Sequence, residues 1–274
     1  MLKDPEALIV RKETWGEYCL LALHSPRLAR TAKPGQFLMV RVSDQPYPLL
    51  RRPFSIHARE RNRLEIFFSK VGTGTAILAE RNPGETLDIL GPLGKGFRIA
   101  RKKQTGGTAF LVGGGRGIAP LYFLARELRS RGVRPRIFYG GKTESHLPLL
   151  SKLAAQGFDV FVSTDDGSLG FRGFIGPMLE RELARWLSAS RRGPAVRQPE
   201  IFACGPDAML KGVAGIADRY QIPAQFSLEA IMGCGIGACW GCVKRIKQAG
   251  RTGWVKICED GPVFKNSEIV WEDA

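Results

Sequence analysis

The chain has 274 residues, of which 44% are hydrophobic and 24% are charged, which is typical of a globular protein with two domains and an ample core. Its formal net charge of +15 raises the question of a nucleic-acid partner. The basic residues are spread along the chain, however, and are denser only at 98–103 and 181–197, which contain a single aromatic residue, Trp186, and lack the repeated interleaving of a single-strand binder. We therefore predict no nucleic-acid partner and interpret the charge as a solvated surface that attracts anionic cofactors and acidic partners.

The hydrophobic residues are not gathered into a targeting or membrane segment. The N-terminal segment carries charges at Lys3, Asp4 and Glu6 and lacks the apolar core of a signal peptide. No later stretch reaches the roughly 18 consecutive apolar residues of a membrane helix, so the sequence predicts a cytoplasmic protein without membrane contact. Thiols stay reduced in the cytoplasm, which disfavours disulfides among Cys234, Cys239, Cys242 and Cys258.

The first part of the chain, residues 1–103, predicts short β-strands separated by turns. The β-rich segments are 18–25, 35–44, 52–60 and 63–72, and the turns are 33–36, 60–63 and 82–85. The first helical pattern appears only at 75–82. This succession favours a small antiparallel β-barrel.

Strands and helices alternate in the second part, residues 104–225. Predicted strands cover 108–115, 134–141, 158–166 and 200–206, predicted helices cover 118–132, 145–157 and 176–189, and 189–200 is a predicted loop. Such alternation indicates a parallel, Rossmann-like α/β sheet with right-handed crossovers. The glycines and cysteines of 226–274 suggest a small third module. The predicted fold class is therefore a multidomain α+β protein.

A glycine-rich segment follows the first strand of the α/β part and opens a helix. Gly113, Gly114, Gly115 and Gly117 allow a tight turn whose backbone N–H groups approach a pyrophosphate, although a plain strand-to-helix turn has the same pattern. A later strand ends in Cys204, Gly205 and Pro206, and the strand between them ends in 163–168. Because the carboxyl ends of parallel strands share the edge at which ligands bind, these three strand ends favour a nucleotide site.

The barrel part carries a second group of candidate binding residues. Arg51 and Arg52 stand at the start of the strand 52–60, where an arginine can make a bidentate contact with a diphosphate. The hydroxyl of Ser55 can bond a ring nitrogen of a cofactor. The segment 72–75, Gly-Thr-Gly-Thr, precedes a helical turn and offers backbone N–H groups to phosphate. A surface arginine pair and a helix cap are the structural alternatives.

Four cysteines lie close together near the C-terminal end. Their spacing is C-x4-C-x2-C, followed by fifteen residues and a fourth cysteine. A plant-type [2Fe–2S] ligand set begins with the same spacing, whereas structural zinc usually shows two C-x2-C pairs and only one is present. Four glycines let the backbone wrap closely and direct N–H groups at the sulfurs; they are Gly233, Gly235, Gly237 and Gly241. We predict a [2Fe–2S] cluster, with zinc as the alternative.

Seven motifs follow one another over nearly the whole chain. They are RRPFSI, GTGT, GPLGKGF, GGGRGIAPL, FACGP, SLEAIMGCGIGACWGC and CEDGPVF. This order resembles the electron transfer subunits of dihydroorotate dehydrogenase B, a family within the ferredoxin-reductase superfamily of FAD- and NAD-binding enzymes. The last two motifs are the specific ones, because the glycine motifs are shared more widely.

The resemblance implies FAD in the barrel domain 1–103, NAD in the α/β domain 104–225 and a [2Fe–2S] cluster in the module 226–274. The implied FAD residues are Arg52, Pro53, Phe54, Ser55, Phe67, Phe68, Ser69, Gly74 and Thr75, with Ser69 at a position where relatives often carry arginine. The implied NAD residues are Gly113, Gly114, Gly115, Gly117, Cys204, Gly205 and Pro206. The implied cluster ligands are Cys234, Cys239, Cys242 and Cys258.

The resemblance also implies a function for the whole chain. The family passes electrons between NAD(H), FAD and the cluster to or from an FMN-containing catalytic subunit that oxidises dihydroorotate to orotate, in a heterotetramer of two subunits of each kind. The protein's task is then to bind and orient cofactors, and no acid or base pair is needed. Two alternatives stay open. One is a subunit of an NADH-dependent ferredoxin–NADP⁺ reductase, a sulfhydrogenase or a sulfite reductase, and the other is a basic zinc module that binds nucleic acid.

Overall fold

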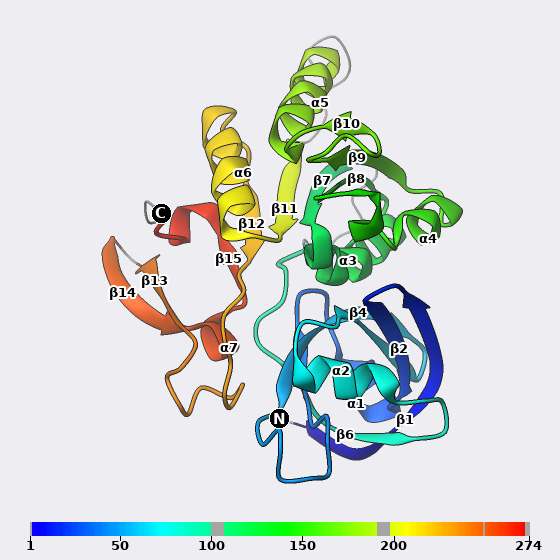
Figure 1. Ribbon diagram of the computed structural model, residues 1–274. Helices are drawn as coiled ribbons and strands as arrows, with labels where there is room; N and C mark the ends of the chain where they lie inside the picture. Colours follow the sequence, from blue (N-terminus) through cyan, green and yellow to red (C-terminus); the bar gives the residue numbers. More distant parts are fainter. Residues whose placement is uncertain (1, 100–106, 191–197, 249, 272–274) are drawn as a thin grey trace. The chain divides into compact units, whose positions relative to one another are not determined.

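The computed structural model describes residues 2–99, 107–190, 198–248 and 250–271 (Figure 1). The chain divides into two compact units, one built from Met1–Phe97 with Leu228–Val263 and the other from Arg98–Ser227 with Phe264–Ala274. The division into 1–103, 104–225 and 226–274 stays a prediction. Its first boundary lies outside the described residues, as do most of the basic segment 98–103 and residues 191–197 of the predicted loop.

The first unit contains a closed six-stranded antiparallel barrel, as predicted. Its strands are β1 (Leu2–Trp15), β2 (Tyr18–His24), β3 (Phe37–Val40), β4 (Arg52–Glu60), β5 (Arg63–Ser69) and β6 (Thr86–Leu93), in the order β1-β2-β5-β4-β3-β6. β1 and β6 are not among the predicted strands; they pair with each other and close the barrel. Two short helices, α1 (Pro26–Thr31) and α2 (Thr73–Glu80), belong to the same unit.

The segment Leu228–Val263, which contains the four clustered cysteines, lies in the same compact unit as the barrel. It contains a hairpin of β13 (Val243–Gln248) and β14 (Arg251–Lys256), followed by the short helix α7 (Ile257–Asp260). The segment touches the barrel where the N–H of Lys95 donates to the Gly261 carbonyl at 2.5 Å. A Cβ atom on Gly94 would lie 2.7 Å from the same carbonyl oxygen. The glycine-dense turn 91–97 thus permits a close approach of the two backbones.

The second unit is built on a seven-stranded sheet. Its strands are β7 (Gly107–Gly114), β8 (Val133–Gly141), β9 (Asp159–Thr164), β10 (Phe171–Arg172), β11 (Glu200–Cys204), β12 (Ala224–Ser227) and β15 (Val263–Lys265), in the order β10-β9-β8-β7-β11-β12-β15. All neighbours from β10 to β12 pair in parallel. The predicted parallel α/β sheet is confirmed.

Four helices cover this sheet. They are α3 (Ile118–Ser130), α4 (Leu150–Ala155), α5 (Ile175–Ser190) and α6 (Asp207–Arg219). The predicted helix 145–157 is shorter than expected, because Pro148 disfavours helical geometry before it and α4 begins only at Leu150. The predicted loop 189–200 begins later than expected, since α5 continues to Ser190. Among the described residues, no helix is both long and apolar enough to cross a membrane.

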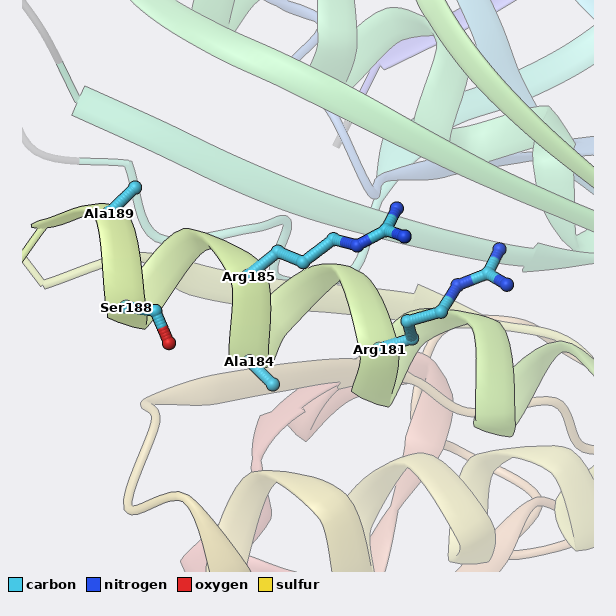
Figure 2. A pocket seen from close by; sticks show the side chains of 5 residues that line it. All are labelled: Arg181, Ala184, Arg185, Ser188 and Ala189. Carbon is cyan, nitrogen blue, oxygen red and sulfur yellow. The ribbon is translucent and has the colours of Figure 1, made fainter.

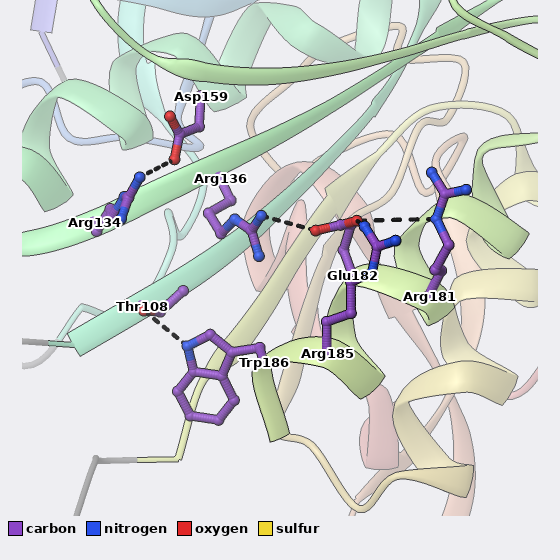
Figure 3. Close-up of polar contacts among 8 residues, drawn as sticks. All are labelled: Thr108, Arg134, Arg136, Asp159, Arg181, Glu182, Arg185 and Trp186. Atoms are coloured by element: carbon purple, nitrogen blue, oxygen red, sulfur yellow. Dashed lines mark hydrogen bonds and ion pairs between the residues drawn. The ribbon is translucent and has the colours of Figure 1, made fainter. Parts of the chain in front are cut away.

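A buried carboxylate ties α5 to the sheet (Figure 3). Glu182 lies at 6% exposure, and its side chain pairs with Arg136 of β8 at 2.9 Å and with Arg185 at 2.6 Å. The guanidinium of Arg136 also lies 4.7 Å from the ring centre of Phe161 on β9. A buried carboxylate needs such partners to offset its desolvation. Part of the basic segment that begins at Arg181 therefore has a structural role.

Candidate functional site

The four predicted cluster ligands lie in the barrel unit as two pairs. The N–H of Cys239 donates to Cys234 Sγ at 3.4 Å, and the N–H of Cys258 donates to Cys242 Sγ at 3.4 Å. Cys242 and Cys258 are buried, Cys234 is half-buried and Cys239 is exposed. Burial, followed by the hydrogen bond with Cys242, raises the pKa of Cys258 to about 12. Burial also opposes ionisation of Cys234, but the N–H groups of Ile236 and Cys239 lower its pKa to about 7.

Further backbone N–H groups point at these sulfurs. Gly237 donates to Cys258 Sγ at 3.1 Å, and Ile236 donates to Cys234 Sγ at 3.5 Å. Gly237 has a φ of 81°, and a Cβ atom there would lie 2.6 Å from a carboxylate oxygen of Glu259. The positive φ favours glycine at the position whose N–H reaches the sulfur. N–H donors to thiolates stabilise an anionic cluster, so the segment fits the chemistry of a [2Fe–2S] group.

The paired arrangement also bears on the zinc alternative. Among the described residues, no three histidine, cysteine, aspartate or glutamate side chains gather as a site for one metal ion. Structural zinc requires four ligands around a single ion. A two-iron cluster held by four cysteines takes two of them on each iron, which two pairs of thiols can supply. The two hydrogen-bonded pairs of cysteines are thus compatible with a two-iron cluster.

The two predicted phosphate motifs of the barrel come together in space. The side chain of Arg52, at the start of β4, lies against the first turn of α2, so that a Cβ atom on Gly74 would lie 2.9 Å from Arg52 Nε. The hydroxyl of Thr75 reaches back and accepts the N–H of Val71 at 2.9 Å and that of Gly72 at 3.2 Å. The first N–H groups of a helix have no intrahelical acceptor, so a guanidinium and a helix N-terminus meet here. The pair is suited to a diphosphate.

The other predicted FAD residues lie on two neighbouring strands. Pro53, Phe54 and Ser55 belong to β4, and Phe67, Phe68 and Ser69 belong to β5. The rings of Phe54 and Phe68 are 5.2 Å apart, whereas Phe67 stacks on Tyr18 at 5.6 Å. Ser69 is buried and Ser55 is half-buried, so the Ser55 hydroxyl is the more accessible of the two.

The predicted nucleotide loops of the second unit also meet, at the carboxyl ends of β7 and β11. A Cβ atom on Gly117 would lie 2.7 Å from the backbone nitrogen of Gly205, and one on Gly114 would lie 2.8 Å from Pro206 Cδ. Gly115 has a φ of 50° and nothing within 4 Å of its Cβ position, so the turn is open there. Gly113 and Gly117 thus lie against backbone, Gly114 lies against side chains, and Gly115 borders free space.

The third predicted strand end lies on the same edge. The N–H of Asp165, after β9, donates to the Gly141 carbonyl at the end of β8 at 3.0 Å. Sequence reasoning missed Met209 on α6, whose Sδ would lie 2.8 Å from a Cβ atom on Gly114. The sequence signal for this contact is the position of Met209 in the helix that begins directly after Pro206.

An open hollow of about 520 Å³ lies elsewhere in the second unit, along α5 (Figure 2). It is lined by Arg181, Ala184, Arg185, Ser188 and Ala189, none of which is a predicted site residue. Arg185 is already paired with Glu182. The hollow therefore adds nothing to the candidate cofactor sites.

Known proteins resemble both the C-terminal segment and the whole chain. Residues 229–270 match the family model for the iron-sulfur cluster binding domain of dihydroorotate dehydrogenase B. The chain is 37% identical over 273 residues to the dihydroorotate dehydrogenase B (NAD(+)) electron transfer subunit of Geobacillus sp. (strain WCH70), covering 98% of this chain and 100% of that one. The subunit of the same name from Desulforamulus reducens is 35% identical and covers 90% of each chain.

A solved structure extends the likeness to the fold. The NADH-dependent reduced ferredoxin–NADP oxidoreductase structure, described for flavin-based electron bifurcation, matches with a TM-score of 0.77 and 27% identity, covering 98% of this chain and 91% of that one. It supports the predicted combination of a barrel with an α/β sheet, and the family model identifies the cysteine-rich segment. With more than a third of its residues identical over nearly its full length to one such subunit, the chain belongs to the family of dihydroorotate dehydrogenase B (NAD(+)) electron transfer subunits.

Proposed function

We propose that this protein is the electron transfer subunit of a type B dihydroorotate dehydrogenase, an NAD-dependent oxidoreductase that passes electrons between NAD(H), FAD and a [2Fe–2S] cluster. The observation that carries the proposal is the set of four cysteines. They stand as two pairs inside the segment that matches the iron-sulfur cluster binding domain, and backbone N–H groups donate to their sulfurs. The zinc alternative has no comparable support.

The cluster would be held by Cys234, Cys239, Cys242 and Cys258, which present soft thiolate ligands. When bound, a [2Fe–2S] cluster exchanges electrons singly with a partner. The chain's own contribution is to orient the thiolates and to place N–H donors at them. The N–H of Gly237 acts on Cys258, which is buried, and that of Gly241 acts on Cys239, which is exposed, at 3.5 Å. Donors of this kind tune a cluster's potential and stability.

FAD would be held by the barrel. Arg52 and the first N–H groups of α2 would bind the diphosphate, because they meet at Gly74. Phe54, Phe67 and Phe68 are buried and pack within β4 and β5, and the half-buried hydroxyl of Ser55 is able to orient a ring nitrogen. When bound, FAD supplies the conversion between two-electron nicotinamide chemistry and one-electron cluster chemistry.

NAD would be held at the carboxyl edge of the second unit's sheet. Gly115 borders open space at the start of the 3₁₀ turn Gly115–Gly117, which leads into α3. Backbone N–H groups at such a turn favour a pyrophosphate. The loop after β11 lies at the same edge and contacts Gly114 and Gly117; its residues are Cys204, Gly205 and Pro206.

The partner follows from the family name. An electron transfer subunit requires a catalytic subunit, and we propose the FMN-containing subunit that oxidises dihydroorotate to orotate in pyrimidine synthesis. The assembly would contain two copies of each subunit. The cytoplasmic location inferred from the sequence remains part of the proposal.

The experiment that tests the proposal starts with a visible absorption spectrum of the purified chain. Flavin and iron–sulfur bands are expected, both bleached by NADH, and a colourless protein would refute the proposal. Coexpression with the dihydroorotate-oxidising subunit of the same organism should then give dihydroorotate-dependent reduction of NAD⁺. Bleaching by NADH without any such coupling would leave the cofactors in place and refute the partner.

One observation favours a second candidate function. The reductase structure described above covers 98% of this chain with 27% identity. A subunit of an NADH-dependent ferredoxin–NADP⁺ reductase would carry the same cofactors and serve another partner. Reduced ferredoxin, rather than dihydroorotate, would then supply electrons in the reconstituted assay.

A further inference from the structure

The strand β3 of the barrel pairs with the strand that carries the predicted flavin residues. In the barrel it lies between β4 and β6, so its backbone is held by hydrogen bonds on both sides. Its pairing with β4 is regular, one residue opposite one residue. The pairs are Phe37 with Ser55, Leu38 with Phe54, Met39 with Pro53 and Val40 with Arg52. Every residue of β3 thus stands opposite one predicted FAD residue.

The pairing also fixes which side chains share a face of the sheet. Successive side chains of a strand point to opposite faces, and residues directly opposite each other on paired strands point to the same face. Phe37 and Ser55 therefore share one face with Met39 and Pro53. Leu38 points to the other face. The face that carries Met39 is thus the face that carries the half-buried Ser55, whose hydroxyl is proposed to orient the flavin.

Part of the cysteine-rich segment packs on Met39. We call residues 234–239 the ligand loop, because they begin and end with a predicted cluster ligand. A Cβ atom on Gly235, in this loop, would overlap Met39 Cγ and lie 2.7 Å from Met39 Sδ. Met39 is fully buried, at 0% exposure. The backbone of the ligand loop therefore lies directly against the thioether side chain, with no room for a larger residue at position 235.

The shape of the ligand loop depends on this contact. Residues 234–239 form no helix or strand, so no backbone ladder holds them in place. Gly235 directly follows Cys234, whose Sγ accepts the N–H of Ile236 at 3.5 Å and that of Cys239 at 3.4 Å. A shift of Gly235 would move this sulfur and both of its donors. The fixed strand β3 thus supplies, through Met39, the support that the loop itself lacks.

We propose that Met39 is a positioning residue, which holds the ligand loop on the same face of the β3–β4 pair as the flavin site. This inference rests on the proposed function, because it concerns the two cofactors that exchange electrons there. Sites built on strands are held more precisely than sites on loops. A single pair of strands would then fix the cluster ligands and the flavin residues relative to each other. The protein's task of orienting its cofactors falls in part on this side chain.

The test compares two buried neighbours of β3 in the full chain loaded with FAD and the cluster. Met39→Ala removes the support under Gly235. It should change the electron paramagnetic resonance spectrum of the reduced cluster and shorten, several-fold, the half-life of the cluster's visible band in an iron chelator. Met39→Leu keeps a similar volume and should restore both quantities. Leu38→Ala is the matched control, because Leu38 is also at 0% exposure but lies against Gly91. It should lower the free energy of unfolding and leave both cluster measurements unchanged.

A second set of variants isolates the contact itself. Gly235→Ala has two unfavourable effects, because Gly235 has a φ of 73° and a Cβ atom there would overlap Met39. In the double variant Gly235→Ala/Met39→Ala the overlap is relieved and the unfavourable φ stays. The cluster's half-life should therefore be longer in the double variant than in Gly235→Ala alone. The difference measures the coupling between the two residues.

The possible outcomes are distinguishable. Equal effects of Met39→Ala and Leu38→Ala on the spectrum and half-life of the cluster would make Met39 an ordinary core residue and overturn the inference. A double variant no better than Gly235→Ala would also overturn it. Both results leave the proposed function intact, whereas a wild type without flavin and iron–sulfur bands would overturn the proposed function and this inference with it. Met39→Val replaces Met39→Ala throughout if the alanine variant does not fold.

Discussion

Gly117 and Cys204 come so close that a Cβ atom on Gly117 would overlap the carbonyl oxygen of Cys204. The loop after β7 and the loop after β11 therefore touch backbone to backbone, in the unit that carries the predicted nucleotide edge. The contact explains why a glycine stands at this position, where the φ angle alone does not require one. It also separates the role of Gly117 from that of Gly115, which borders open space.

Gly117→Ala should push the two loops apart. Overpacking of this kind costs about 1–3 kcal/mol, so the free energy of unfolding of the second unit should fall by that order. The Michaelis constant for NADH should rise as the edge opens. Gly212→Ala is the control, because Gly212 lies in α6 with nothing within 4 Å of its Cβ position. Urea unfolding measures the free energy of unfolding of the two variants, and titrations with NADH measure their Michaelis constants. A Gly117→Ala variant with wild-type values of both quantities would contradict the close contact.

Two adjacent arginines of the barrel should behave differently toward FAD. Arg52→Ala removes the guanidinium that lies at the start of α2, and a charge-assisted hydrogen bond is worth about 1.5–3 kcal/mol. The variant should lose FAD on dialysis. Arg51 is tied to Asp88 at 2.6 Å, so Arg51→Ala should retain FAD. The FAD content of the two variants is measured after extensive dialysis. Full retention of FAD by Arg52→Ala would show that Arg52 does not bind the diphosphate.

The two glycines of the segment 72–75 provide a second pair of variants, which tests the contact between Arg52 and the start of α2. A Cβ atom on Gly74 would lie 2.9 Å from Arg52 Nε, so Gly74→Ala should displace the guanidinium and weaken FAD binding. Gly72 has an extended φ of 175° and nothing within 4 Å of its Cβ position, so Gly72→Ala should leave binding unchanged. Fluorescence titration of the apoprotein with FAD measures both dissociation constants. Equal constants for the two variants would show that Arg52 and Gly74 do not act together.

The sequence predicted the classes of structure more reliably than the contacts between them. Alternating strands and helices identified the parallel sheet, because β7, β8 and β11 are each followed by turn residues and a helix. β1 and β6 were missed although both contain apolar residues, such as Ile9 and Ile89, and their pairing with each other is a long-range property that a local pattern does not show. The sequence also did not show that the cysteine-rich segment packs on the barrel, since that depends on Gly94 and Gly235 meeting distant backbone and side chains.

Cys19, on β2 of the barrel, should be a poorly reactive thiol. Burial is the main reason that its pKa is raised to about 11, against smaller opposite effects from Lys12 and Lys70. The raised pKa stabilises the fold below the unfolded value of 9.0, and this stabilisation is lost as the pH rises through about 11. Unfolding of the wild type should therefore become easier between these pH values, relative to Cys19→Ala. A constant difference between the two proteins would contradict this prediction.

Cys239→Ser separates the two halves of the proposed electron path. Serine offers a hard, poorly ionised hydroxyl in place of a soft thiolate, so the cluster should be lost or labile and its absorption bands should fall. The FAD and NAD sites do not include Cys239, so dye reduction by NADH should continue. Coupling of dihydroorotate oxidation to NAD⁺ should fail, because the cluster is the proposed link to the partner. The control is Cys19→Ala, which changes a buried cysteine outside the ligand set and should keep the cluster.

Loss of assembly with the partner would look like loss of electron transfer, because the four ligands also stabilise the segment that holds them. Size-exclusion chromatography with the partner therefore accompanies the assay. A variant that lacks the cluster, assembles normally and still couples the two reactions at the wild-type rate would show that electrons do not pass through this site.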